Sequence, residues 1–256
     1  MSYLRKVFRH GKDGNIIEVC KYKNGRYGRQ IKNNKPIKAT PPEQLRWQSK
    51  NNVRKCWRLL DDNFCPGDLW IMLSYPYKVR PLTETVRQNM SLFLRKARKM
   101  YKKAGKVFKY IFSAGRGKRG AVHFHMVLPK FNITDIRDLW TEIINDGDWV
   151  KTEFEPLDKK HDYYKLANYI IKNSEETFAS DDPVYHKRYC ASKNLIKQNV
   201  RAKVIKAKDW KKQPAERPDY YIDKERSYIG YNVYGYPVQY TVYVKLPRFD
   251  TGDRGG

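Results

Sequence analysis

The chain is poor in acidic residues and cysteine and contains no long apolar run. Its 256 residues hold 27 Asp and Glu against 53 Lys and Arg, which gives a formal net charge of +26 at pH 7. This charge exceeds what solubility asks of a small domain and indicates a surface that meets polyanions. No apolar run reaches membrane-spanning length, and the first residues lack a signal-peptide core. We therefore expect a cytoplasmic protein without a membrane partner.

Metal-binding cysteine motifs and nucleotide-binding loops are also missing. The four cysteines, Cys20, Cys56, Cys65 and Cys190, are scattered without C-x-x-C spacing, which predicts free thiols in a reducing compartment and no zinc site. No G-x-x-x-x-G-K-[ST] loop occurs, so a fused helicase is not expected. Twenty tyrosines and six tryptophans are interleaved with the basic residues instead. Most belong to a core, but the pattern suits base stacking and phosphate contact on single strands.

Changes in composition divide the chain into three parts. Residues 1–48 are basic and turn-rich, and predict an arm or a small β appendage, with strands over 15–22 and 26–31 around an Asn24-Gly25 turn. Residues 49–178 carry the clearest apolar periodicity. Residues 179–256 are basic and rich in tyrosine, and predict a strand within 200–207 and a β-hairpin within 220–246.

The middle part predicts an α+β domain. Apolar residues at three- and four-residue steps predict a helix over 83–103, with Thr83 as N-cap and Gly105 as the C′ residue. Other helices are expected within 43–60 and over 134–145 and 163–172, and strands over 69–74, 109–113, 121–128 and 149–155. From residue 69 the order is β, α, β, β, α, β, α, which predicts a sheet with helices packed against it.

The strand predicted over 121–128 contains two histidines separated by one apolar residue. Because side chains alternate along a strand, His123 and His125 share one face and their apolar neighbours share the other. Two imidazoles on one face can bind a single divalent metal ion. The alternative is a solvated or packed histidine pair without a ligand.

The helix predicted over 163–172 places a tyrosine at the border of its apolar face. Lys165 and Lys172 lie on the same side of the helix as Tyr169. Adjacent ammonium groups favour a phenolate, which predicts that Tyr169 acts as an oxygen nucleophile on a phosphodiester. Tyr163 and Tyr164 are rival nucleophiles.

Three motifs in order make the sequence resemble a known family. They are residues 69–76 (Leu-Trp-Ile-Met-Leu-Ser-Tyr-Pro), His123-Phe124-His125 and Tyr169-Ile170-Ile171-Lys172. Together they resemble the single-tyrosine rolling-circle replication initiators of the HUH endonuclease superfamily, in particular those of Gram-positive plasmids and integrated elements. The resemblance implies an antiparallel sheet of ferredoxin- or RRM-like layout, with the histidines on a central strand and basic β extensions at both ends.

The resemblance also implies an activity. Tyr169 would cut single-stranded DNA, leaving a 5′-phosphotyrosine and a free 3′-hydroxyl that primes replication, and the strand would later be rejoined. Lys172 would assist, and Mg²⁺ or Mn²⁺ would be held partly by His123 and His125. The implied partners are single-stranded or hairpin origin DNA, a host helicase and a DNA polymerase.

The sequence departs from the family at one expected metal ligand. Relatives often carry a glutamate just before the histidine strand, and the matching position here is Gly115. Two imidazoles alone suit Mg²⁺ poorly, because it prefers oxygen ligands. Glu153 and Glu155 are our candidates for the missing ligand, and waters or the substrate phosphate are the other possibility. A solvated strand face is the alternative role for both glutamates.

Basic residues near these motifs are candidates for DNA contact. They are Arg116, Lys118, Arg119, Lys165, Lys187, Arg188 and Lys193. A mobile loop is the alternative for residues 185–195. Two other functions remain open at this point: a single-strand DNA transposase of the HUH type, and a non-catalytic DNA-binding initiator relic whose metal site decayed when Gly115 arose.

Overall fold

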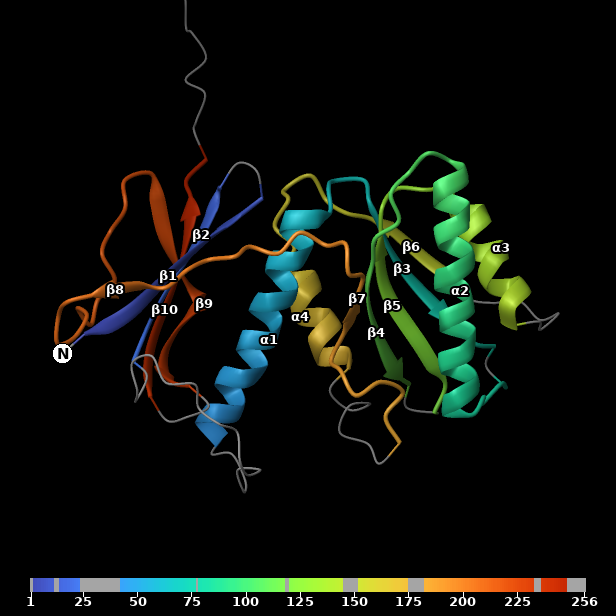
Figure 1. Ribbon diagram of the computed structural model, residues 1–256, viewed down its shortest axis with the longest axis horizontal. Coiled ribbons are helices and arrows are strands. Elements are labelled where there is room, and N and C mark those ends of the chain that lie inside the picture. The colour runs from blue at the N-terminus through green and yellow to red at the C-terminus, as the bar shows by residue number, and fades with distance from the viewer. Residues whose placement is uncertain are drawn as a thin grey trace, which may run out of the picture. The chain divides into compact units, whose positions relative to one another are not determined.

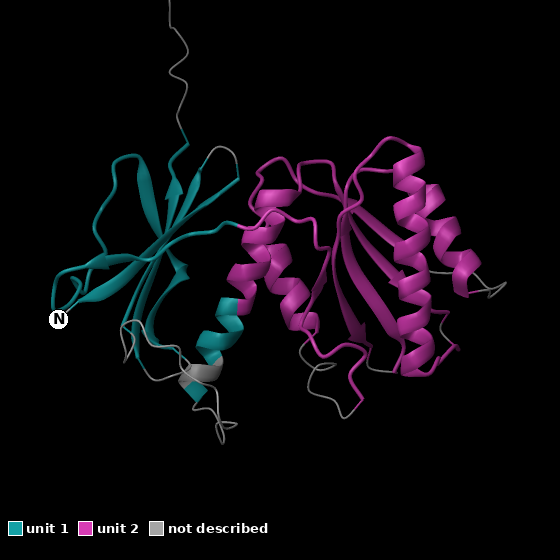
Figure 2. Cartoon of the chain, in the orientation of Figure 1, with its two compact units in different colours: residues 1–51, 198–256 teal, residues 52–197 magenta. Residues whose placement is uncertain are grey.

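The computed structural model of the protein describes residues 2–11, 14–23, 42–76, 78–117, 120–144, 152–174, 182–232 and 236–247. Contacts divide the chain into two compact units (Figure 2), unit 1 with Met1–Asn51 and Gln198–Gly256, and unit 2 with Asn52–Lys197. Within the described residues there are four α-helices and two antiparallel five-stranded sheets. The predicted α+β fold class is confirmed.

Unit 1 contains one sheet, to which both the first and the last part of the chain contribute. Its strand order is β8-β1-β2-β10-β9, with β1 Tyr3–His10, β2 Ile16–Tyr22, β8 Lys203–Ile205, β9 Tyr220–Tyr231 and β10 Pro237–Lys245. Because β2 pairs with β10, the two parts that composition separated at 1–48 and 179–256 share this sheet. Strand β1 was not predicted, since its apolar residues come in adjacent pairs instead of alternating.

Unit 2 is built on the second sheet, in the order β6-β3-β5-β4-β7. Its strands are β3 Leu69–Ser74, β4 Ile111–Arg116, β5 Val122–Leu128, β6 Thr152–Pro156 and β7 Cys190–Ala191. Strand β5 lies in the middle, antiparallel to β3 on one side and to β4 on the other. The two histidines therefore lie on the central strand, as predicted.

Four helices accompany the sheets. They are α1 Pro42–Asn63, α2 Thr83–Lys103, α3 Ile133–Ile144 and α4 Tyr164–Asn173. In unit 2, α2 and α3 cover one face of the sheet and α4 covers the other (Figure 1). Val122, Phe124 and Met126 of β5 are buried against Phe93 of α2 and Trp140 of α3. This apolar core orients β5, because alternation then turns both histidines toward α4.

The end of α2 is fixed by a glycine. Gly105 has a φ of +68°, and its N–H donates to the carbonyl of Lys102 at 3.0 Å. The next N–H, from Lys106, reaches back to the carbonyl of Tyr101 at 2.9 Å. These two bonds form a Schellman motif, which confirms the prediction for Gly105.

The predicted N-cap of α2 is wrong. Leu82 occupies the N-cap position, and no side chain caps the helix. The hydroxyl of Thr83 instead bonds the carboxylate of Asp182 and accepts a hydrogen bond from Arg116 at 3.1 Å. These partners are distant in sequence, so local spacing did not reveal them.

Several other expectations concern residues outside the described ranges. These include the partner strand over 26–31, the start of the strand predicted from 149, and Lys118 and Arg119. The remaining strands and helices match their predicted positions to within a few residues, and β9 pairs with β10 as the predicted hairpin. No helix among the described residues is both long and apolar enough to cross a membrane.

Replacing Gly105 should destabilise the protein through backbone strain alone. A Cβ at Gly105 would meet no atom within 4 Å, but the φ of +68° is unfavourable for other residues. We expect Gly105→Ala to cost about 1–2 kcal/mol of stability, measured by chemical denaturation. Gly117→Ala is the control, because its φ is outside the left-handed region and the nearest atom is 3.8 Å away. Equal stability of both variants would contradict this account.

Candidate active site

The candidate site lies on the face of the unit 2 sheet that α4 covers. In the strand register, His123 lies opposite Ser74 of β3 and Gly115 of β4. His125 lies opposite Met72 and Ser113 in the next row of the same face. The two imidazole rings are 4.9 Å apart between centroids and nearly perpendicular.

Helix α4 contacts both histidines with residues four positions apart. The Tyr169 hydroxyl lies 3.2 Å from Nε2 of His125, and the Asn173 amide nitrogen lies 3.2 Å from Nε2 of His123. Four residues of helix advance about 6 Å, and two residues of strand advance about 6.8 Å. The two spacings match closely enough for each histidine to receive one α4 side chain.

The apolar side of α4 holds the helix in this position. Ala167, Ile170 and Ile171 are fully buried. Tyr169 lies at the border of that side and remains 43% exposed. Its hydroxyl can therefore contact His125 while the ring stays accessible to a substrate.

Gly115 leaves the space that Asn173 and His123 occupy. A Cβ at position 115 would lie 2.7 Å from the Asn173 amide nitrogen and 2.7 Å from Nε2 of His123. Such approaches are too close for a real side chain, so any larger residue would displace one of these groups. The position where relatives carry a glutamate is thus filled by an amide from α4.

Burial keeps both histidines neutral. It lowers the pKa of His125 to about 4, and the nearby His123 lowers it further while Glu153 opposes the shift. Burial also lowers the pKa of His123, against hydrogen bonds from Asn173 and the backbone of Ala121. Neutral imidazoles can accept hydrogen bonds or bind a metal ion at physiological pH.

The expected effect of the lysines on Tyr169 is wrong. The pKa of Tyr169 is raised, first by burial and then by the negative charge of Glu153. Lys165 and Lys172 are exposed to solvent on α4, where water screens their charge. The phenol is therefore protonated in the unliganded site, and its ionisation requires help from outside these two lysines.

The rival tyrosines lie elsewhere. Tyr163 is 3% exposed, and burial raises the pKa of its phenol. The ring of Tyr164 packs edge-on against Trp57 at 5.1 Å. Of these three tyrosines, the structure places Tyr169 against the histidine pair.

The elements that carry this arrangement run from β3 to α4. Residues 68–178 match the sequence model of a family of replication-associated proteins, named for the protein ORF2. The match is consistent with a replication initiator and includes the histidine strand and the tyrosine helix. No curated protein matches the chain, and no solved structure matches it.

The structure does not bring the two glutamates into one ligand group with the histidines. Glu153 lies opposite Met72, so one strand separates it from His125. Glu155 lies one row further along, opposite Trp70. In the part of the chain that the structure describes, no three His, Cys, Asp or Glu side chains gather closely enough to hold a metal ion.

The basic candidates for DNA contact are spread over unit 2. Arg116 is engaged with Thr83 and Asp182, the latter at 3.7 Å. Lys187 and Lys193 are exposed near β7, and Arg188 is half-buried there. The outward positions of the lysines suit contact with a polyanion but do not define its path.

Two site residues were missed by the sequence analysis. Asn173 lies four positions after Tyr169, a spacing that places both on one side of a helix and could have signalled it. Trp70 of β3 stacks on the ring of His125, with centroids 5.9 Å apart and planes at 21°, and meets Tyr169 edge-on at 5.4 Å. Its alternation with Met72 and Ser74 would have placed it on the histidine face.

The neutral histidines should make the protein sensitive to acid. The folded pKa of His125, about 4, lies below the unfolded value near 6.5. The stability from this group is thus complete above pH 6.5 and is lost as the pH falls toward 4, because the unfolded chain binds the proton first. In EDTA, we expect the fall in melting temperature from pH 7.5 to 5.0 to be smaller in His125→Asn than in wild type.

Differential scanning calorimetry at the two pH values measures this difference. His186→Asn is the control, because His186 is exposed and should leave the wild-type fall unchanged. An identical fall in all three proteins would refute the role assigned to burial.

Proposed function

We propose that the protein is an HUH-type replication initiator that nicks single-stranded origin DNA by attack of Tyr169. The observation that carries this proposal is the contact of the Tyr169 hydroxyl with His125, at 3.2 Å, on the strand that also presents His123. The family match over residues 68–178 supports a role in replication.

The proposed reaction is a transesterification that conserves one phosphodiester bond. The phenolic oxygen of Tyr169 forms a bond to phosphorus, and the bond from phosphorus to the 3′ oxygen breaks. The phenol loses its proton, and the 3′ oxygen leaves as a hydroxyl. The product is a 5′-phosphotyrosine, and attack by a 3′-hydroxyl in the reverse direction rejoins the strand.

The residues present fit a divalent ion, Mg²⁺ or Mn²⁺. His123 and His125 would supply neutral nitrogen ligands, and the side-chain oxygen of Asn173 would supply the oxygen that a hard cation prefers. The assignment of amide nitrogen and oxygen in Asn173 is reversible by a flip of its side chain. A bound ion stabilises charge on the phosphate oxygens.

The surrounding charge suits the proposed substrate. The net charge of +26 attracts a polyanion, and Lys165 and Lys172 project from the helix that carries the nucleophile. A host helicase and a DNA polymerase are the proposed partners, since the chain shows no nucleotide-binding loop of its own. A related single-strand transposase would use the same chemistry, and the DNA flanking the gene would distinguish the two.

Removing the nucleophilic oxygen should abolish the covalent product. We expect wild-type protein, mixed with single-stranded oligonucleotides from the element's origin and Mn²⁺, to form an adduct that survives a denaturing gel. Tyr169→Phe should form none, because phenylalanine has no oxygen, while its DNA binding stays close to wild type. Tyr164→Phe is the matched control and should form the adduct.

An adduct that persists in Tyr169→Phe would move the nucleophile to another tyrosine. Tight binding without an adduct, with every origin fragment and both metal ions, would favour a non-catalytic DNA-binding protein.

Asn173 should contribute to metal affinity. We expect Asn173→Ala to bind Mn²⁺ about 10- to 100-fold more weakly than wild type, and His123→Ala to lose measurable binding. Electron paramagnetic resonance of free Mn²⁺ measures this without any activity assay. Asn168→Ala, on the same helix, is the matched control, and equal weakening in both asparagine variants would argue against a ligand role.

A further inference from the structure

A second cavity lies beside the candidate active site. It has a volume of about 280 Å³ and is lined by Trp70 and Met72 of β3 and by Glu153, Phe154 and Glu155 of β6. Met72 lies directly opposite His125 in the sheet, so the cavity continues the row that carries the histidine. All of its lining belongs to unit 2.

Trp70 forms the wall between this cavity and the histidines. Its indole stacks on the His125 ring at 5.9 Å and meets the nucleophile Tyr169 at 5.4 Å. Its Nε1–H is buried and has no hydrogen-bond partner among the described residues. A flat aromatic wall one ring away from the nucleophile is the kind of surface on which a nucleobase stacks.

The charge of the cavity is opposite to that of the protein as a whole. In a chain of net charge +26, its rim carries two exposed carboxylates, Glu153 and Glu155, opposite Met72 and Trp70. Carboxylates repel phosphate groups, so this cavity is unsuited to the DNA backbone. They accept hydrogen bonds from amino groups of bases, such as N4 of cytosine.

We propose that this cavity is a base pocket, which holds the base of a nucleotide next to the scissile phosphate. The base stacks on Trp70 and donates its amino hydrogens to Glu153 or Glu155. The pocket therefore selects cytosine, adenine or guanine over thymine, whose pairing edge carries two carbonyl oxygens and no amino group. This assignment rests on the proposed function only for the position of the base relative to the cut.

A metal ion is a poorer occupant of the pocket. No histidine or third acidic group joins Glu153 and Glu155 in the described part of unit 2. The pocket also opens beside the face that the proposed mechanism assigns to single-stranded DNA, so an unstacked base reaches it without leaving that strand.

Fluorescence anisotropy with labelled homopolymers tests base selection directly. The protein carries Tyr169→Phe, so that no adduct forms, and is titrated into dC and dT oligonucleotides of equal length in EDTA. We expect tighter binding of the dC strand by about 5- to 10-fold. In Glu153→Gln/Glu155→Gln both affinities should rise, because repulsion of phosphate falls, while the dC-to-dT ratio approaches one.

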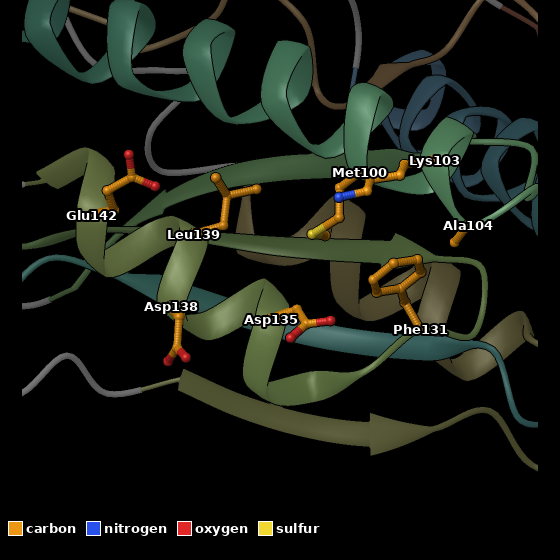
Figure 3. Close-up of a pocket in the computed structure, with 8 residues that line it drawn as sticks. All are labelled: Met100, Lys103, Ala104, Phe131, Asp135, Asp138, Leu139 and Glu142. Carbon is orange, nitrogen blue, oxygen red and sulfur yellow. The ribbon is translucent and has the colours of Figure 1, made fainter.

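A matched double variant separates base reading from net charge. Asp138→Asn/Glu142→Gln removes the same two charges from α3, where both residues line a groove of about 710 Å³ between α2 and α3 on the other face of the sheet (Figure 3). This control should keep the wild-type ratio. Trp70→Ala should weaken binding of both strands, and Trp70→Phe should retain most of it because the ring still stacks.

The outcomes separate the pocket from the nuclease. A wild-type ratio near one, a ratio that survives loss of both glutamates, or an equal loss of ratio in the α3 control would each overturn the base pocket. A dC preference that depends on the glutamates, together with no adduct from active protein, would uphold the pocket and overturn the nuclease alone.

Discussion

The site depends on a match between two repeat lengths. Two residues of β5 and four residues of α4 cover nearly the same distance, so each histidine faces one helical side chain. The match works only while α4 lies flat on the sheet at close range. Buried Ala167 allows that approach on the helix, and Gly115 allows it on β4. A side chain at position 115 would push the amide of Asn173 away from His123.

The two faces of β5 have separate tasks. Its apolar side chains are locked between α2 and α3, which fixes the rotation and register of the strand. Its histidine face is thereby presented without any contribution from loop conformation. Placement on the middle strand also hydrogen-bonds β5 on both sides, so the histidines are carried by the best-supported part of the sheet. Sites on such elements hold their geometry more closely than sites on loops.

Local periodicity predicted the elements of unit 2, because each has an amphipathic pattern and short connections. The histidine pair and Tyr169 were also predictable, since their spacing is visible in sequence. The shift in the pKa of Tyr169 was not, because it arises from burial and from Glu153 on a distant strand. The shared sheet of unit 1 was missed for a similar reason: Lys21 of β2 and Gln239 of β10, joined by a hydrogen bond of 3.0 Å, are 218 residues apart.

That long-range pairing has a consequence for how the protein is made. A ribosome completes residues 52–197 before it reaches β10, and domains generally fold as units during synthesis. Strands β1 and β2 emerge first but have no neighbour on the β10 side until translation is almost over. The nascent chain thus carries an exposed edge of β2 next to a finished catalytic unit, and the sheet of unit 1 is the last part to close.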